Sequence, residues 1–197
     1  GAAADTATLE ALREGDMRSA EIGQPQLECL PTFNLAELLL WDGELDEAME
    51  RALRARSLQE RFFAEEATPL DPLLVARIAC ARGEPEPARE ALAWIAEHCA
   101  DDALPPATAA LIDLVRLSAS DLEAGADAPA QWSSEGTWRA AIAALDQHGS
   151  INEQQETRCL AAAVARACGR DAVAATWVAD GLALDPPPRW AARLRSL

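Results

Sequence analysis

The chain has 197 residues, of which half are hydrophobic and a quarter are charged, and 33 acidic residues against 17 basic ones give a formal charge of −16. A chain this apolar can bury enough surface to offset its ordering entropy, which argues against a disordered protein. The charge argues against direct nucleic-acid binding, because phosphate contacts need clustered basic residues. No apolar run without charges reaches the roughly 18 residues of a membrane span.

The residue types favour helices along the whole chain. Ala and Leu, which are strong helix formers, are abundant, whereas the β-branched and aromatic residues that favour strands are scarce. No run of alternating apolar and polar residues is evident. We therefore expect an all-α protein, forming a single domain over residues 1–197, whose helices approach closely through small side chains.

Three segments share one pattern around a glycine. Gly43, Gly83 and Gly169 each follow an apolar residue and an Ala, by eight and seven positions, and each precedes another Ala by five. Apolar residues at helical spacing, a Gly that ends the helix, and acidic residues that open the next one predict a helical hairpin. The clearest hairpins are predicted at 30–62, 70–100 and 156–187.

The other segments complete the chain order. A weaker echo at 15–20 predicts a truncated hairpin at the start, and a degenerate pair is expected at 105–149, with helices near 107–120 and 137–148. The last segment, 188–197, is expected to be a helix that caps the stack. Small side chains are predicted where paired helices cross, at Ala36, Ala48, Ala76, Ala88, Ala162 and Ala174.

Two of these hairpins resemble the tetratricopeptide repeat. LAELLLWDGELDEAMERALRAR (35–56) matches a standard unit nearly position for position, and AAAVARACGRDAVAATWVADGLALDP (161–186) includes the closing Asp-Pro of that family. The spacing of Gly43 and Gly83 is 40 residues, against about 34 in the family. The resemblance implies a TPR-like α-solenoid, a right-handed superhelix of about four to five stacked antiparallel hairpins.

The last third is similar to a narrower group. APAQWSSEGTWRAAIAALDQHG and ETRCLAAAVARACGRDAVAATWVADGLALD resemble the helical region of large ATP-binding LuxR-type regulators of actinobacteria, with Trp138 to Ala141 in the place of their Trp-x-x-Ala helix. Those regulators carry an ATPase domain before this region and a DNA-binding helix-turn-helix after it, and neither lies in this chain. The resemblance implies an interaction or sensing module of a transcriptional regulator.

No catalytic motif is evident, so we expect a protein that is not an enzyme. There is no phosphate-binding loop, dinucleotide fingerprint or nucleophile elbow. His98 and His148 lie near predicted helix C-termini, where an imidazole serves as a cap. The five Cys residues lack metal-ligand spacing, which predicts reduced thiols and neither a metal nor a cofactor. Without a visible secretory signal, we expect the reducing cytoplasm.

Aligning the hairpins on their glycines places six candidate ligand or partner residues on the concave face: Phe33, Asn34, Glu37, Trp41, Arg77 and Arg166. By the resemblance, Asn34 falls where peptide-binding members often carry an Asn that contacts the ligand backbone; the alternative is a local hydrogen bond. Arg77 and Arg166 either receive an acidic group of a ligand or pair with neighbouring carboxylates. Trp94 and Trp177 are expected in the core, Trp190 in the cap, and Trp41 and Trp132 at exposed contacts.

These observations favour a non-catalytic module that binds a peptide, a partner domain or a small effector in a concave groove. The alternatives are a standalone tetratricopeptide scaffold or adaptor, a resistance protein that sequesters a small molecule, and a helical enzyme. A homodimer is left open, and no contact with nucleic acid or membrane is expected. The charge of −16 favours a basic or polar partner surface and an association that salt weakens.

Overall fold

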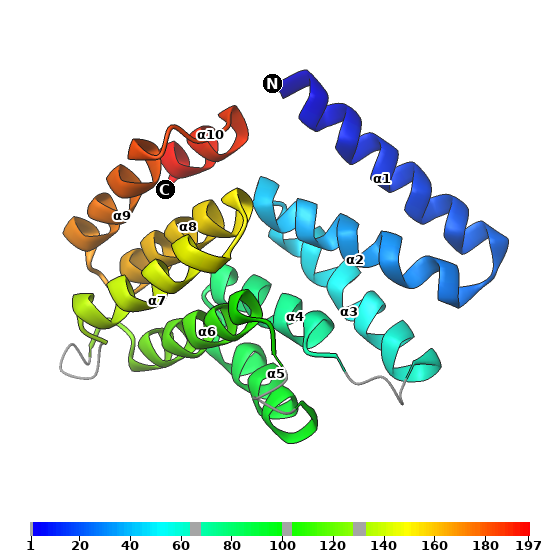
Figure 1. The fold of residues 1–197 in the computed structure, drawn as a ribbon, viewed down its shortest axis with the longest axis horizontal. Coiled ribbons are helices and arrows are strands. Elements are labelled where there is room, and N and C mark those ends of the chain that lie inside the picture. The colour runs from blue at the N-terminus through cyan, green and yellow to red at the C-terminus, as the bar shows by residue number, and fades with distance from the viewer. Residues whose placement is uncertain (1, 64–67, 100–103, 128–132) are drawn as a thin grey trace.

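The computed structural model describes residues 2–63, 68–99, 104–127 and 133–197, and every regular element within them is a helix, which confirms the all-α prediction (Figure 1). In chain order the helices are α1 (Ala2–Ile22), α2 (Pro25–Asp42), α3 (Leu45–Phe62), α4 (Leu70–Arg82), α5 (Pro85–His98), α6 (Pro106–Ala124), α7 (Glu135–His148), α8 (Ile151–Ala167), α9 (Asp171–Ala183) and α10 (Pro188–Ser196). Among these described helices, none is both long enough and apolar enough to cross a bilayer.

The three predicted glycine turns are confirmed. Gly43 joins α2 to α3, Gly83 joins α4 to α5, and Gly169 joins α8 to α9, with φ angles of 86°, 77° and 71°. At the first turn the N–H of Gly43 donates to the carbonyl oxygen of Leu39 at 2.9 Å, as does the N–H of Glu44 at 3.0 Å. These bonds satisfy the last carbonyls of α2 while the chain reverses, in a conformation that other L-residues adopt only at a cost.

The alanines predicted at helix crossings are completely buried. Ala36 and Ala48 of the first hairpin have no exposed surface, and the same holds for the corresponding pairs Ala76 and Ala88, and Ala162 and Ala174. A methyl group lets two helix backbones approach closely, and a larger side chain would force them apart. The repeat therefore has a packing origin.

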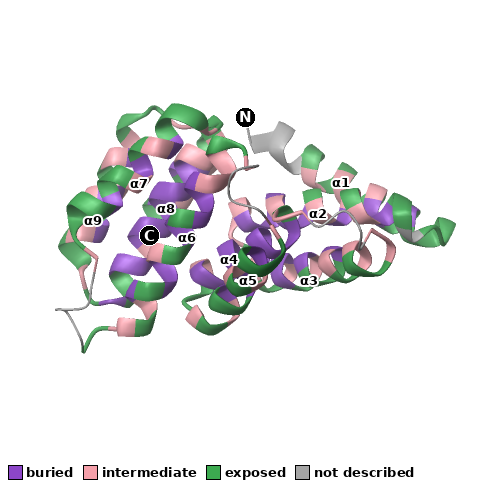
Figure 2. Cartoon of the chain, turned by 60° about the horizontal axis from the view of Figure 1, so that its bottom comes forward, coloured by how far each residue is buried: buried purple, intermediate pink, exposed green. Residues whose placement is uncertain are grey.

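The first helices of the pairs form the inside of the molecule. Along the chain α2 contacts α4, α4 contacts α6 and α6 contacts α8, and α4 also touches α8 directly. In Figure 2, α4 and α8 are buried along most of their length, whereas α1, α7 and α9 expose one side. We call α2, α4, α6 and α8 the inner layer. This layer curves strongly enough for α4 to contact α8, which belongs to the second hairpin after its own.

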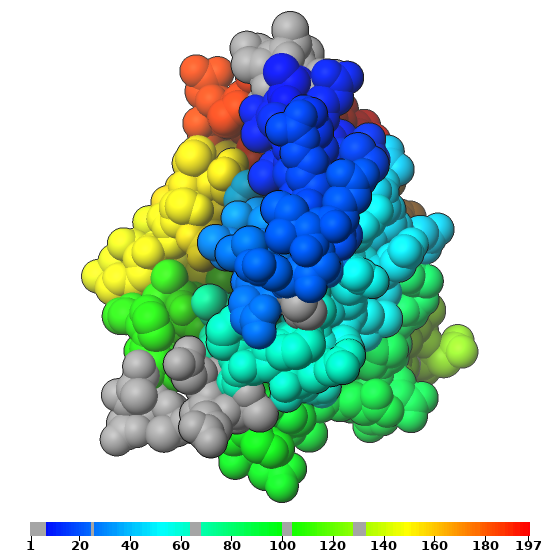
Figure 3. Space-filling view, turned by 90° about the vertical axis from the view of Figure 1, so that its right-hand side faces the viewer, coloured from blue at the N-terminus to red at the C-terminus, as the bar shows by residue number. Residues whose placement is uncertain are grey.

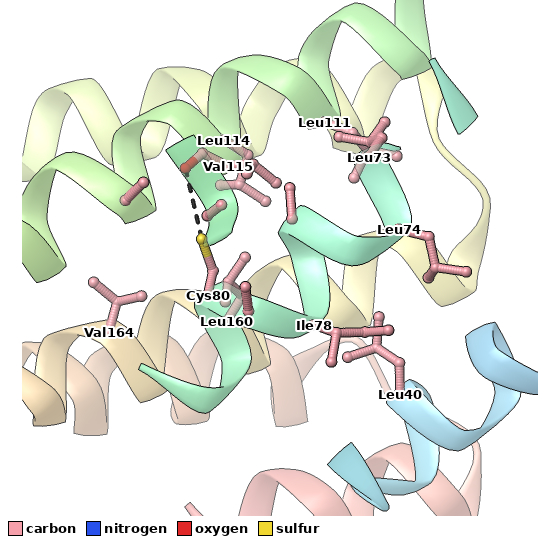
Figure 4. Close-up of a cluster of buried hydrophobic side chains, with 14 of the residues drawn as sticks. Leu40, Leu73, Leu74, Ile78, Cys80, Leu111, Leu114, Val115, Leu160 and Val164 are labelled. Carbon is pink, nitrogen blue, oxygen red and sulfur yellow. Dashed lines mark hydrogen bonds between the residues drawn. The ribbon is translucent and has the colours of Figure 1, made fainter. Parts of the chain in front are cut away.

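Helix α4 lies at the centre of the hydrophobic core. Leu73 and Ile78 of α4 belong to one buried cluster with residues of α2, α6 and α8. In Figure 4, Leu73 lies beside Leu111 of α6, and Ile78 lies beside Leu40 of α2. The thiol of Cys80 donates to the carbonyl oxygen of Val115 at 3.8 Å. Helices far apart in the sequence therefore meet through the residues of one short helix.

The prediction of a truncated hairpin at 15–20 is wrong. Helix α1 runs without a break through Gly15 and ends at Ile22, so the reversal lies at Gly23, where φ is 69°. In the middle of this helix the side chain of Asp16 accepts hydrogen bonds from Thr32 of α2 and, at 2.6 Å, from Arg51 of α3. These contacts hold the middle of α1 against the next two helices. The following hairpin also begins earlier than predicted, at Pro25.

The C-terminal helix α10 closes one side of the molecule. It packs on α8 and α9, as the capping prediction requires, and it also contacts α1 and α2 from the other end of the chain. Trp190 of α10 is buried with Cys159 and Leu194. Figures 1 and 3 show the C-terminal segment beside the N-terminal half of α1. Trp94 packs against the core and Trp177 is buried in it, as predicted; Trp132 lies outside the described residues.

Candidate ligand-binding site

A group of hydrogen-bonded side chains around the buried Arg77 and Glu156 joins three inner helices. Arg77 of α4 donates from Nε to Glu156 Oε1 of α8 at 2.7 Å, from Nη2 to the second oxygen of Glu156, and from Nη1 to Glu37 Oε1 of α2 at 2.9 Å. The indole N–H of Trp41 donates to Glu156 Oε2 at 2.7 Å. We call these four residues the Arg77 cluster. It lies where the strong curvature of the inner layer brings α4 and α8 together.

The carboxylates keep Arg77 charged inside the protein. Arg77 is 5 % exposed and Glu156 is 6 % exposed. Burial by itself would lower the pKa of Arg77, but Glu156 and then Glu37 raise the pKa further above its usual range. Of the two interpretations that the sequence left open for Arg77, the structure shows pairing with carboxylates. These contacts fix the three helices relative to one another.

Three of the six predicted groove residues meet in this cluster, namely Glu37, Trp41 and Arg77. Phe33 packs against the core nearer the start of α2 and lines a different pocket. Asn34 is exposed, and its side chain makes no hydrogen bond with a described residue. Arg166 is exposed near the end of α8, about 15 Å along the helix from Glu156 at 1.5 Å per residue. The structure therefore does not bring Phe33, Asn34 and Arg166 to the cluster.

Beside the cluster lies a cleft of about 550 Å³ between α1, α2 and α10, which we call the end cleft. Its lining includes Leu9 and Arg13 of α1, Trp41 and Asp42 of α2, Glu44, and Pro188, Arg189, Ala192, Arg193 and Ser196 of α10. The Trp41 ring lines the cleft and lies 6.1 Å from the ring of Trp190, centre to centre. Trp41 thus belongs both to the cleft wall and to the buried cluster behind it.

The lining of the end cleft is locally basic in an acidic chain, with three arginines against Asp42 and Glu44. Arg189 Nε lies 2.7 Å from Asp42 Oδ1, and Arg13 pairs with Glu47 at 2.6 Å. Arg193 is different, because its guanidinium makes no ion pair or hydrogen bond with a described residue. It lies over the turn at Gly43, where a Cβ would come within 1.8 Å of Arg193 Nη1.

Sequence reasoning missed Glu156, Arg189 and Arg193. No local signal connects Arg77 with Glu156, because the two residues are 79 positions apart. A signal did exist for the arginines of α10: Arg189 and Arg193 are four residues apart and flank Trp190, which places both on one face of a short helix. That face is the one turned toward the end of α2.

The buried thiols of α4 and α8 are poor reactive groups. Burial raises the pKa of the Cys80 and Cys159 thiols to about 12, although Arg193 opposes the shift at Cys159. These thiols therefore stay protonated at neutral pH and are poor nucleophiles. Within the described part of the chain, no three His, Cys, Asp or Glu side chains are grouped to hold a metal ion. What the end cleft presents is a guanidinium beside an indole ring.

No protein-family model matches the chain, and comparison with curated proteins and with solved structures finds no match either.

Proposed function

We propose that this chain is a non-catalytic sensing module that binds an anionic ligand in the end cleft. The observation that carries the proposal is Arg193, whose guanidinium has no partner among the described residues and lines a cleft of about 550 Å³ together with Trp41. Ligand sites are commonly clefts of about 300–1,000 Å³ with a few polar groups on largely apolar walls. A guanidinium binds a carboxylate or phosphate through two parallel hydrogen bonds, and an indole offers a flat apolar face.

The position of the cleft suggests how binding is transmitted. Its walls come from both ends of the chain, α1 and α2 on one side and α10 on the other. The Arg189–Asp42 pair and the packing of Arg193 over Gly43 hold α10 against the end of α2. A ligand that touches both Trp41 of α2 and Arg193 of α10 strengthens the contact between these two helices. Binding then stabilises α10 in its contact with α2, relative to an arrangement in which α10 has moved away, by the difference in ligand affinity between the two.

In this proposal the module is the TPR-like helical region of a cytoplasmic LuxR-type regulator, folded as a right-handed superhelix. Its ligand is a small effector, or a segment of a peptide or partner protein, that carries an acidic group. The resemblance of the last third of the chain to that group supports the assignment. The paired helices and glycine turns support the superhelix. The site lies between the two ends of the chain, with α1 and α2 on one side and α10 on the other.

The proposal can be tested with phenyl phosphate, which combines an anion with a flat ring. Its binding is measured by tryptophan fluorescence and by calorimetry, with benzyl alcohol as the neutral comparison. Arg193→Gln is expected to weaken binding by about tenfold or more, the value of a charged hydrogen bond. Arg195→Gln is the matched control, because Arg195 is exposed on the same helix and lines no part of the cleft.

We expect Arg195→Gln to change the affinity by less than about twofold, since its charge is solvated. Equal losses in the two variants would show a general effect of charge and overturn the site. Absence of binding by phenyl phosphate and by benzoate at millimolar concentration would overturn the anionic ligand. Preferential binding of benzyl alcohol would have the same consequence.

A further inference from the structure

A second pocket lies at the opposite end of α2, between α2, the end of α3 and the start of α4. Its volume is about 300 Å³, and its walls include Leu30, Phe33, Phe63 and Leu70. Phe33 is eight residues before Trp41, so this pocket lies about 12 Å along α2 from the end cleft. Asp71 and Cys29 also line it. We call it the Asp71 pocket.

Asp71 is a carboxyl group without enough partners. It is 6 % exposed, and its Oδ1 is buried without a hydrogen-bond partner among the described residues. Burial raises the pKa of Asp71, and its own backbone N–H and Arg56 offset this only in part. Arg56 is engaged elsewhere, because its Nε donates to Glu60 at 2.8 Å and its guanidinium lies 5.8 Å from the centre of the Trp94 ring. Native proteins rarely bury a polar atom unsatisfied, and those that do call for an explanation.

We propose that the Asp71 pocket binds a small amine with an apolar body, its ammonium group pairing with the Asp71 carboxylate. The volume is near the lower limit for small-molecule sites, which favours a compact ligand over a protein segment. The net charge of −16 attracts cations to such a carboxylate. Leu30 and Leu70 remain 66 % and 50 % exposed, and an apolar ligand body in the pocket would cover part of this surface.

This site is independent of the anion-binding site proposed in the end cleft. The two pockets share no lining residue, and they present charges of opposite sign. Asp71 lines only the Asp71 pocket, and Arg193 lines the end cleft. Failure of one proposal therefore leaves the other standing, because each has its own probe and its own variant.

Benzylammonium is the probe, and neutral benzyl alcohol, which has the same ring, is the comparison. By calorimetry we expect wild type to bind the ammonium at least about tenfold more tightly than the alcohol, as a charged hydrogen bond predicts. Asp71→Asn has nearly the same shape and is expected to abolish this preference. Glu50→Gln is the matched control, because it removes one negative charge from an exposed side chain of α3 that does not line the pocket. It is expected to keep the preference.

Cys29 gives a local readout of occupancy. It lines the pocket and is half-buried, whereas Cys99 is also half-buried but does not line it. Benzylammonium is expected to slow the reaction of Cys29 with N-ethylmaleimide, measured by peptide mass spectrometry, and to leave Cys99 unchanged. Circular dichroism verifies that Asp71→Asn is folded.

Each of the opposite results overturns the proposal. One such result is that wild type binds benzyl alcohol as tightly as benzylammonium. Another is that Asp71→Asn keeps the preference for benzylammonium, and a third is that wild type shows no detectable binding of benzylammonium. Binding without protection of Cys29 would place the amine elsewhere and would also overturn it.

Discussion

Removing the guanidinium of Arg77 by substitution with Met is expected to destabilise the fold strongly. Met keeps most of the apolar stem, so the change tests the charge more than the volume. It leaves Glu156, which is 6 % exposed, with the N–H of Trp41 as its remaining side-chain donor among the described residues. It also removes the partner of Glu37, which is partly exposed.

The expected magnitude follows from burial. Breaking a buried ion pair by removing one partner costs about 3–5 kcal/mol, because a charge is left in the interior without compensation. Glu37 adds little, since solvent reaches its carboxylate. In a chain of this length such a loss lowers Tm by about 10 °C. Replacing both Arg77 by Met and Glu156 by Leu is expected to restore most of the stability, because an apolar pair avoids the desolvation cost of both charges.

Urea unfolding followed by circular dichroism measures both the midpoint and the slope for each variant. Arg116→Met is the matched control: Arg116 pairs with Asp113 on the surface, with side chains 62 % and 66 % exposed, and such a pair contributes less than about 0.5 kcal/mol. If Arg77→Met costs no more than this control, or if the double variant loses the sum of the single losses, the cluster does not act as a buried ion pair and the reasoning is refuted.

Three further predictions concern the turns, the helix crossings and the buried carboxyl. Gly43→Ala and Gly83→Ala impose the same left-handed backbone strain, about 1 kcal/mol, but only the Cβ at position 43 would clash with Arg193, at 1.8 Å. We therefore expect similar urea midpoints for the two variants and a loss of phenyl phosphate affinity in Gly43→Ala only. Equal affinities would show that Arg193 is not part of the binding site. Ala88→Leu is expected to lower the unfolding free energy by about 1–3 kcal/mol, because Ala88 is fully buried at a helix crossing. A loss of only about 0.3 kcal/mol, well below this cost of overpacking, would mean that Ala88 does not lie at a close helix crossing. Burial raises the pKa of Asp71 in the folded state above 3.8, so the folded protein loses stability as the pH rises from 3.8 through the folded pKa and Asp71 ionises. Over this pH range Asp71→Asn should gain stability relative to wild type. Urea midpoints of the two proteins that differ by the same amount at every pH would contradict this.

The elements themselves could be predicted because their signals are local. The predicted pair at 105–149 corresponds to α6 and α7, and the predicted last helix corresponds to α10. A Gly that ends a helix, such as Gly83, and an Ala at a fixed offset from it, such as Ala88, identify a hairpin without knowledge of any other part of the chain. The prediction of a turn at 15–20 is wrong because Gly15 by itself does not end a helix: α1 continues to Ile22, and its Asp16 contacts the distant Arg51.

The candidate sites show the same division. Spacing placed Glu37 and Trp41 on one face of α2, and this face does lie inward. It gave no indication that Glu156 would complete the cluster or that α10 would carry Arg193 to the end of α2. Nor did it indicate that Oδ1 of Asp71 would be buried without a hydrogen-bond partner among the described residues. Each of these features depends on a contact between helices from different parts of the chain.

The amino-acid sequence by itself determined the helical class, the glycine turns and the buried alanines of this protein. The reason is that helix periodicity, end signals and close packing within a hairpin involve residues a few positions apart. Only the tertiary structure decided that the inner layer curves until α4 meets α8 and α10 meets α2. That curvature is the sum of all the inter-helix packings, so no single segment encodes it, and it brings together the charged groups of the Arg77 cluster and the end cleft.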